Sequence, residues 1–413
     1  MYRYRRKKEK PLSSRIDRFL LAVGVVLLAL FLATNLLPES RESALAELLV
    51  STRYKKLLGD ETANALALEF LEQHPGLQIR FTDEEADVLL FAGSELQQLI
   101  HSGELGAEPL VIPLVSHMDM LFYNIDVLRA AGFDRPPRSA TEFVTWARST
   151  SGTGAAGFAM ALNPQDRDSL SRDIFSWIWA AGGNFWNFER GASLSHEARP
   201  VINSPVTVSV LFFLRELYRE GVMSPHIFTK TGAEMLEDFA QGRVAMMIAS
   251  TREIPFLREK MGGDTFGFTS IPGIAVAGAG GLARSGIELS YIYAGIRAES
   301  ESIEAARDFI AFLAEKNQFI ANRLEAVPGV IPGSPAGFAF GQHIAGDFNY
   351  LRAWDIFESS QIVYGFSRSA LADEFEESIR DELYAFFEGR QNATATAAFI
   401  QNRWDDIYTQ GRQ

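Results

Sequence analysis

Cysteine is absent from this chain of 413 residues. The protein therefore has no disulfide bond and no lipid-modified N-terminal cysteine, so outside the cytoplasm its fold depends on the hydrophobic core alone. Catalytic patterns are missing as well: the six histidines lack metal-ligand spacing, and there is no G-x-S-x-G segment or Walker motif. The sequence argues against an enzyme and contains no cofactor or metal signature.

One stretch near the N-terminus carries no charge. Residues 19–37 are uncharged and mostly apolar, whereas residues 1–18 contain eight Lys or Arg and two acids. A helix of this length spans roughly the hydrocarbon core of a bilayer, about 30 Å. Since Lys and Arg stay cytoplasmic, we expect a transmembrane helix at 19–37, a tether at 38–44 and the remaining chain outside the cell membrane. The alternative is a cleaved signal peptide.

Positive charge is scarce in the rest of the chain. The net charge of the whole protein is −13 although its first 18 residues are basic, so the exported part is strongly acidic. Such a surface argues against nucleic acid or an anionic lipid surface as a partner.

Hydrophobic periodicity predicts alternating strands and helices. Strands at 48–52, 77–81 and 87–91, with helices at 62–73 and 95–101, give the βαβ order that is typical of a parallel sheet. Further strands are predicted at 110–114, 121–125, 244–248, 266–270 and 289–296. Further helices are predicted from Ser139, Ser204 and Ser300, at 235–241, and at 375–387 and 393–408.

Short segments occur in a characteristic order along the exported part. They are residues 112–116 with 121–124, 130–133 with 136–137 and 141–143, 180–183, 239–247, and 268–273 with 280–281 and 304–313. In this order the chain resembles the extracellular solute-binding proteins of ABC importers, the family that includes maltose- and other sugar-binding proteins.

The resemblance implies an α/β, two-lobed periplasmic-binding-protein-like fold with interlobe crossing strands, preceded by the N-terminal transmembrane helix. Lobe 1 would comprise residues 45–113 and 274–325, and lobe 2 residues 120–260 and 330–413. Ligand would bind between the lobes and favour their closure, because contacts from both lobes exist only in the closed state.

Aromatic residues around Gly182 and Gly183 are the strongest local signal for a ligand site. Trp177, Trp179 and Trp186 could stack on the apolar faces of sugar rings, and Asn184 could bind hydroxyl groups. The alternative is that these side chains pack in the core of lobe 2. Residues two apart on a helix point in different directions, so at most one of Trp177 and Trp179 is expected to face the cleft.

Polar candidates follow the predicted strands. Asp119 could accept hydrogen bonds at the cleft floor, and Arg252, where sugar-binding relatives often have Trp, could bind an anion. Helix caps, solvated turns and a surface ion pair are the alternative roles. The complete set of candidate ligand contacts is Ser94, Ser116, Asp119, Trp177, Trp179, Asn184, Trp186, Arg252, Gly281 and Tyr364.

The resemblance implies a membrane-anchored substrate-binding component of an ABC importer. It would capture a small polar solute, with a carbohydrate as the favoured class, and deliver it to permease subunits without covalent chemistry. A two-lobed receptor with a sensory or structural envelope role is the alternative. The missing Trp near Arg252 and the poorly matched first strand favour that second interpretation.

Overall fold

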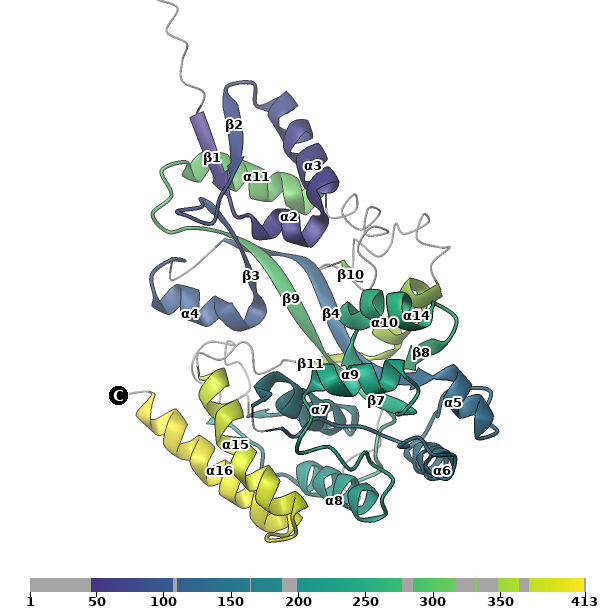
Figure 1. Ribbon diagram of the computed structural model, residues 1–413. Helices are drawn as coiled ribbons and strands as arrows, with labels where there is room; N and C mark the ends of the chain where they lie inside the picture. Colours follow the sequence, from purple (N-terminus) through teal and green to yellow (C-terminus); the bar gives the residue numbers. More distant parts are fainter. Residues whose placement is uncertain are drawn as a thin grey trace, which may run out of the picture.

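The computed structural model describes residues 46–106, 110–163, 165–187, 199–276, 285–316, 331–332, 348–363 and 371–411. Two groups of helices gather around opposite ends of two long strands, β4 (Val111–Asn124) and β9 (Gly286–Ile296) (Figure 1). The predicted transmembrane helix and tether lie outside the described residues. Among the described helices, none is long and apolar enough to cross a membrane.

The first lobe contains the predicted parallel strands. β1 (Ala46–Val50) pairs in parallel with β2 (Leu77–Phe81) and with β3 (Val88–Ala92), which confirms the βαβ prediction. The helices of this lobe are α2 (Arg53–Leu58), α3 (Asp60–Gln73), α4 (Leu96–His101) and α11 (Ile303–Glu315). Helix α2 was not predicted, because it has only six residues and Gly59, with φ 79°, separates it from α3.

The second lobe holds most of the helices (Figure 1). Ser204 caps α8 with Pro205 in its first turn, as the sequence predicts. The elements of this region are α5 (Ile125–Ala130), α6 (Ala140–Ser151), α7 (Arg167–Ala180), β5 (Trp186–Asn187), β6 (Arg199–Pro200), α8 (Pro205–Arg219), α9 (Gly232–Ala240), β7 (Met246–Ser250), η2 (Thr251–Glu253), α10 (Ile254–Met261), β8 (Phe266–Thr269), α14 (Phe348–Ser359), β11 (Gln361–Val363), α15 (Ala372–Phe387) and α16 (Ala393–Gln410).

Strand β4 corrects the sequence interpretation. Two separate strands at 110–114 and 121–125 were expected, but a single strand of 14 residues runs through both. Its first part pairs with β9, and its last part pairs with β7 and β8. The polar stretch between the apolar runs therefore stays in the ladder, because neighbouring strands satisfy its backbone groups. A short third segment, β10 (Ile331–Pro332), pairs antiparallel to β4 at Val115 and Ser116.

Two main hydrophobic cores meet along the crossing strands. On β4, Leu114 belongs to the smaller core of the first lobe, and Met118 belongs to the larger core of the second lobe. On β9, Leu289 lies in the larger core and Ala294 in the smaller one. The change of core within a few residues divides the molecule into two lobes, while the predicted limits of each lobe in sequence stay a prediction.

Helix caps agree with the sequence interpretation at α6 and differ from it at α11. Ser139 Oγ caps α6 as expected, but the Glu142 carboxylate accepts bonds from Arg135 and from the backbone of Arg138. For α11 the N-cap residue is Ser302, not Ser300. Ser300 Oγ instead donates to Asp87, which ties the start of α11 to β3.

Candidate functional site

The carboxyl ends of the parallel neighbours β1 and β3 lie side by side at one edge of the sheet. From β1 the chain continues to β2 on one side, and it returns to β3 on the other side. Ligands of open α/β sheets bind in the crevice at such a switch point. Arg53 follows β1, whereas Ser94 lies in the turn η1 (Gly93–Glu95) that follows β3.

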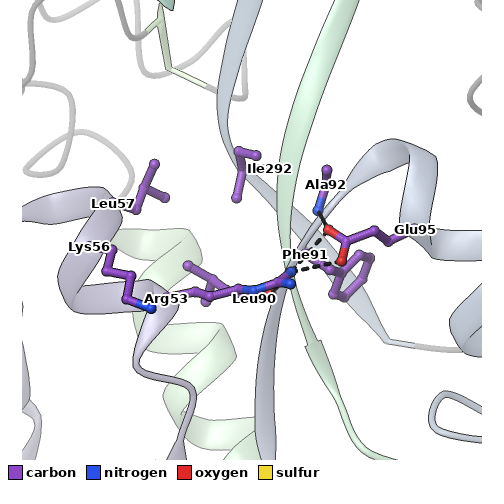
Figure 2. A pocket seen from close by; sticks show the side chains of 8 residues that line it. All are labelled: Arg53, Lys56, Leu57, Leu90, Phe91, Ala92, Glu95 and Ile292. Atoms are coloured by element: carbon purple, nitrogen blue, oxygen red, sulfur yellow. Dashed lines mark hydrogen bonds and ion pairs between the residues drawn. The ribbon is translucent and has the colours of Figure 1, made fainter. Parts of the chain in front are cut away.

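A pocket of about 290 Å³ opens at this switch point, and Figure 2 shows it from close by. Arg53 reaches from α2 to Glu95, with an Nη1–Oε1 distance of 2.8 Å, and also donates to the Leu90 carbonyl. Glu95 Oε2 accepts from the backbone N–H of Ala92 at 2.7 Å. The residues around the pocket are Arg53, Lys56, Leu57, Leu90, Phe91, Ala92, Glu95 and Ile292.

One face of the β4–β9 ladder continues from this pocket toward the second lobe. Ile292 lies opposite Val115, and His117 opposite Ser290, so these positions share a face with Asp119. Ser290 is exposed, whereas Met118 and Leu289 on the other face are buried in the larger core. The face that carries Asp119 forms the floor between the two cores, where Ser290 is exposed and His117, Asp119 and Ile292 are half-buried.

A second pocket, of about 220 Å³, lies on the side of the second lobe. It is formed by the start of α7, the start of α9 and the carboxyl end of β7, with Arg172 and Arg252 among its lining residues. Asp166 joins the two helices, because its carboxylate accepts from the backbone N–H groups of Ser169 and Gly232. The helix N-termini are thus already satisfied by this chain.

Asp119 and the two arginines interact through space. The Asp119 carboxylate makes no hydrogen bond or ion pair within the described part of the chain. Burial raises the pKa of Asp119, while the charges of Arg172 and Arg252 act in the opposite direction. The carboxylate can therefore accept hydrogen bonds from a bound molecule.

Each arginine at the second pocket has a carboxylate neighbour of its own. Arg172 donates from Nε and Nη2 to Asp173 Oδ1, both at 3.2 Å, and Arg252 donates from Nε to Glu253 at 3.1 Å. Burial raises the pKa of Asp173 to about 6 despite the Arg172 charge. The side chain of Arg172 is 15% exposed and that of Arg252 is 58% exposed. Both guanidinium groups keep further N–H donors for another partner.

The two tryptophans of α7 lie in the core. Trp177 is fully buried, with its ring centroid 5.1 Å from that of Phe143. Trp179 is 2% exposed and packs against Phe175 and Phe185. These positions match the core alternative, because other aromatic side chains pack against both indole rings.

The other predicted contacts are scattered. Ser116 is buried on β4, on the face opposite Asp119. The Asn184 side chain is exposed and bonds to the backbone N–H and carbonyl of Trp186, which is half-buried at the start of β5. Gly281 and Tyr364 lie outside the described residues. The structure thus brings together Asp119 and Arg252 from the predicted set.

Several lining residues escaped the sequence analysis. Arg172 lies on the same helix as the tryptophans, where the aromatic signal drew attention away from the charged positions. Leu57 and Ile292 come from elements far apart in sequence. Arg172 lies in the polar first half of α7, next to Asp173, so neither this residue nor the apolar pocket had a distinctive signal in the sequence.

Two α/β lobes share the crossing strands β4 and β9, and each lobe has a pocket at the ends of its strands. The sequence profile described as bacterial extracellular solute-binding protein matches residues 91–318, more than half of the chain. The chain belongs to this family of bacterial extracellular solute-binding proteins.

Similar proteins support the fold. A binding protein of Brucella abortus (strain 2308) is 20% identical over 184 residues, which cover 44% of this chain and 42% of the relative. The cyclic alpha-maltosyl-1,6-maltose binding protein of Arthrobacter globiformis has a TM-score of 0.71 at 14% identity, covering 89% of this chain and 100% of that chain. The GacH receptor of Streptomyces glaucescens, solved unliganded and with acarbose, has a TM-score of 0.67 at 16% identity, covering 88% and 98%. Likeness at these identities establishes the fold.

Proposed function

We propose that this protein is the membrane-anchored substrate-binding component of an ABC importer, and that it captures a small polar solute by lobe closure. The observation that carries the proposal is Asp119, a carboxylate on the floor between the lobes that has no partner in the described part of the chain. Closure would remove water from it, and a desolvated carboxylate needs hydrogen-bond donors. The solute supplies them.

A carbohydrate fits these groups better than an anion does. Arg172 and Arg252 line the second pocket together with two carboxylates, those of Asp166 and Glu253, and the carboxyl groups of Asp119 and Asp173 lie within electrostatic reach of Arg172. This balance disfavours an anionic solute, because neighbouring carboxylates already offset the positive charges. Hydroxyl groups can donate to Asp119 and accept from both arginines without adding charge. The Arthrobacter globiformis and Streptomyces glaucescens proteins named above bind cyclic alpha-maltosyl-1,6-maltose and acarbose, which agrees with this class.

The membrane anchor is part of the proposal. An uncleaved helix at 19–37 would hold the lobes beside the permease and raise their effective concentration there. Cell fractionation tests this directly: the full chain is expected in the membrane fraction, and a variant starting after residue 44 behind a cleavable signal is expected in the soluble extracytoplasmic fraction. Recovery of a shortened native chain in the soluble fraction would contradict the anchor.

Binding and uptake test the role. Titration of the full chain in mild detergent with hexoses and maltose is expected to give saturable binding and a rise in melting temperature with sugar concentration. Deletion of the gene is expected to abolish uptake of the bound sugar, and the wild-type copy is expected to restore it. Saturable binding with unchanged uptake would favour a second role, that of a sensory or structural receptor. One observation favours this role: among the described residues that line the two pockets, Phe91 alone is aromatic.

A further inference from the structure

The two pockets differ in polarity. In the first lobe, Leu57, Leu90 and Ile292 contribute carbon to the pocket, and its two oppositely charged side chains, Arg53 and Glu95, satisfy each other at 2.8 Å (Figure 2). In the second lobe, charged side chains surround the pocket. A charged group placed in the first pocket would find Arg53 and Glu95 already paired and only the exposed Lys56 as a further charge, so its loss of water would be costly. An apolar group placed there would gain free energy by leaving water.

The first pocket borders the sheet face that carries Asp119. Ile292 shares a face of the sheet with Ala92 of β3, which also lines the first pocket, and with Val115 of β4. Asp119 follows Val115 by four residues on the same face, so it lies about 13 Å along the strand from the level of Ile292. One elongated solute can therefore contact both ends of this floor.

We propose that the solute is an amphipathic glycoside. Its hydroxyl-bearing sugar binds at Asp119, Arg172 and Arg252, and an uncharged apolar substituent, an aryl or branched alkyl group, fills the pocket between Leu57 and Ile292. This inference rests on the proposed function and adds the class of solute. The volume of about 290 Å³ accommodates a substituent of the size of a phenyl ring.

The probes are matched sets of glycosides. D-glucose, D-galactose, D-mannose and maltose are each compared with their methyl and phenyl glycosides in both anomeric forms, by calorimetric titration of the full chain in mild detergent. For at least one sugar, the phenyl glycoside is expected to bind about tenfold or more tightly than the methyl glycoside, because it buries an additional ring.

Two variants place this gain in the first-lobe pocket. Ile292→Thr keeps a β-branched side chain in β9 but makes the pocket wall polar, and Leu57→Trp, on a half-buried position of α2, fills the pocket. Both are expected to remove the advantage of the phenyl group while the methyl glycoside binds as before. The control is Leu68→Trp, because Leu68 is 63% exposed on α3 and lines neither pocket. Circular dichroism melts verify that each variant is folded.

The outcomes separate this inference from the proposed function. Equal binding of free sugars, methyl glycosides and phenyl glycosides overturns the amphipathic class and leaves sugar capture standing. A phenyl advantage that survives in both pocket variants also overturns it, because the ring then binds elsewhere. Failure of the folded protein to bind any member of the panel overturns both the inference and the carbohydrate assignment.

Discussion

Asp119 and Ile292 face the same side of the sheet, although they belong to strands that are distant in sequence. Ile292 lies opposite Val115, and Asp119 is an even number of positions further along β4. Met118, which precedes Asp119, and its partner Leu289 on β9 point to the opposite face, into the larger core. This alternation places a carboxylate and an apolar side chain on one face of the sheet. The carboxylate can be tested by substitution.

Asp119→Asn is expected to weaken sugar binding about 10- to 100-fold, because it removes a charged hydrogen-bond acceptor. The melting temperature without sugar is expected to stay the same or to rise, since the carboxylate has no partner in the described chain and burial opposes its charge. Calorimetric titration and thermal melts measure the two effects. The control is Asp126→Asn, at an exposed position on α5. Unchanged affinity in Asp119→Asn would remove this residue from the site.

Trp177→Ala is expected to lower the free energy of unfolding by about 3–5 kcal/mol, because it empties a fully buried indole site beside Phe143. Trp177→Phe retains most of the ring volume and is expected to cost less. Urea unfolding measures stability, and titration measures the affinity of the folded fraction. Lost affinity at unchanged stability would instead support the ligand-stacking role that the sequence suggests for this residue.

Acid is expected to weaken the attachment of α6. Hydrogen bonds from Arg135 hold the pKa of Glu142 at about 2, well below its ordinary 4.5. The folded state therefore binds fewer protons there than the unfolded state, so this contribution is complete above pH 4.5 and is lost as pH falls toward 2. Glu142→Gln is expected to lose less stability than the wild type over that pH interval, as measured by urea unfolding. High salt is expected to reduce the difference, since the pair is partly exposed. Parallel pH profiles of the two proteins would show that the pair does not stabilise the fold.

The Arg53–Glu95 pair is expected to contribute little to stability. The side chains are 53% and 36% exposed, and such pairs couple by less than about 1 kcal/mol. A double-mutant cycle with Arg53→Met, Glu95→Gln and the double variant measures this coupling from urea unfolding. A coupling of several kcal/mol would contradict this prediction. It would mean that the ion pair holds α2 to β3.

Local signals in the sequence predicted much of the fold. The strands at 77–81 and 266–270, the cap at Ser204 and the C-terminal helices agree with β2, β8, α8, α15 and α16 to within a few residues. These elements depend on periodicity and capping, which are properties of neighbouring residues. The continuous β4 was missed because its polar centre is held by pairing with β9 and β7, which no local window contains.

The site was predicted less completely. Asp119 and Arg252 were predicted as ligand contacts because they follow predicted strands, and strand ends converge in α/β sheets; this role stays a prediction. Trp177 and Trp179 were equally attractive in sequence, but helix packing buries both. An indole suits a core as well as a sugar surface, so only its surroundings decide which role it takes.

By itself, the amino-acid sequence determined the absence of disulfides, the alternation of strands and helices, and the family resemblance, and it predicts a membrane anchor or signal peptide in the basic and uncharged N-terminal segments, because each depends on composition or on local order. The tertiary structure alone decided which side chains face the space between the lobes. Leu57, Asp119, Arg172 and Ile292 come from four separate elements. The strands β4 and β9 connect these elements, because they pair with each other and pass from one core to the other. That pairing joins residues far apart in sequence.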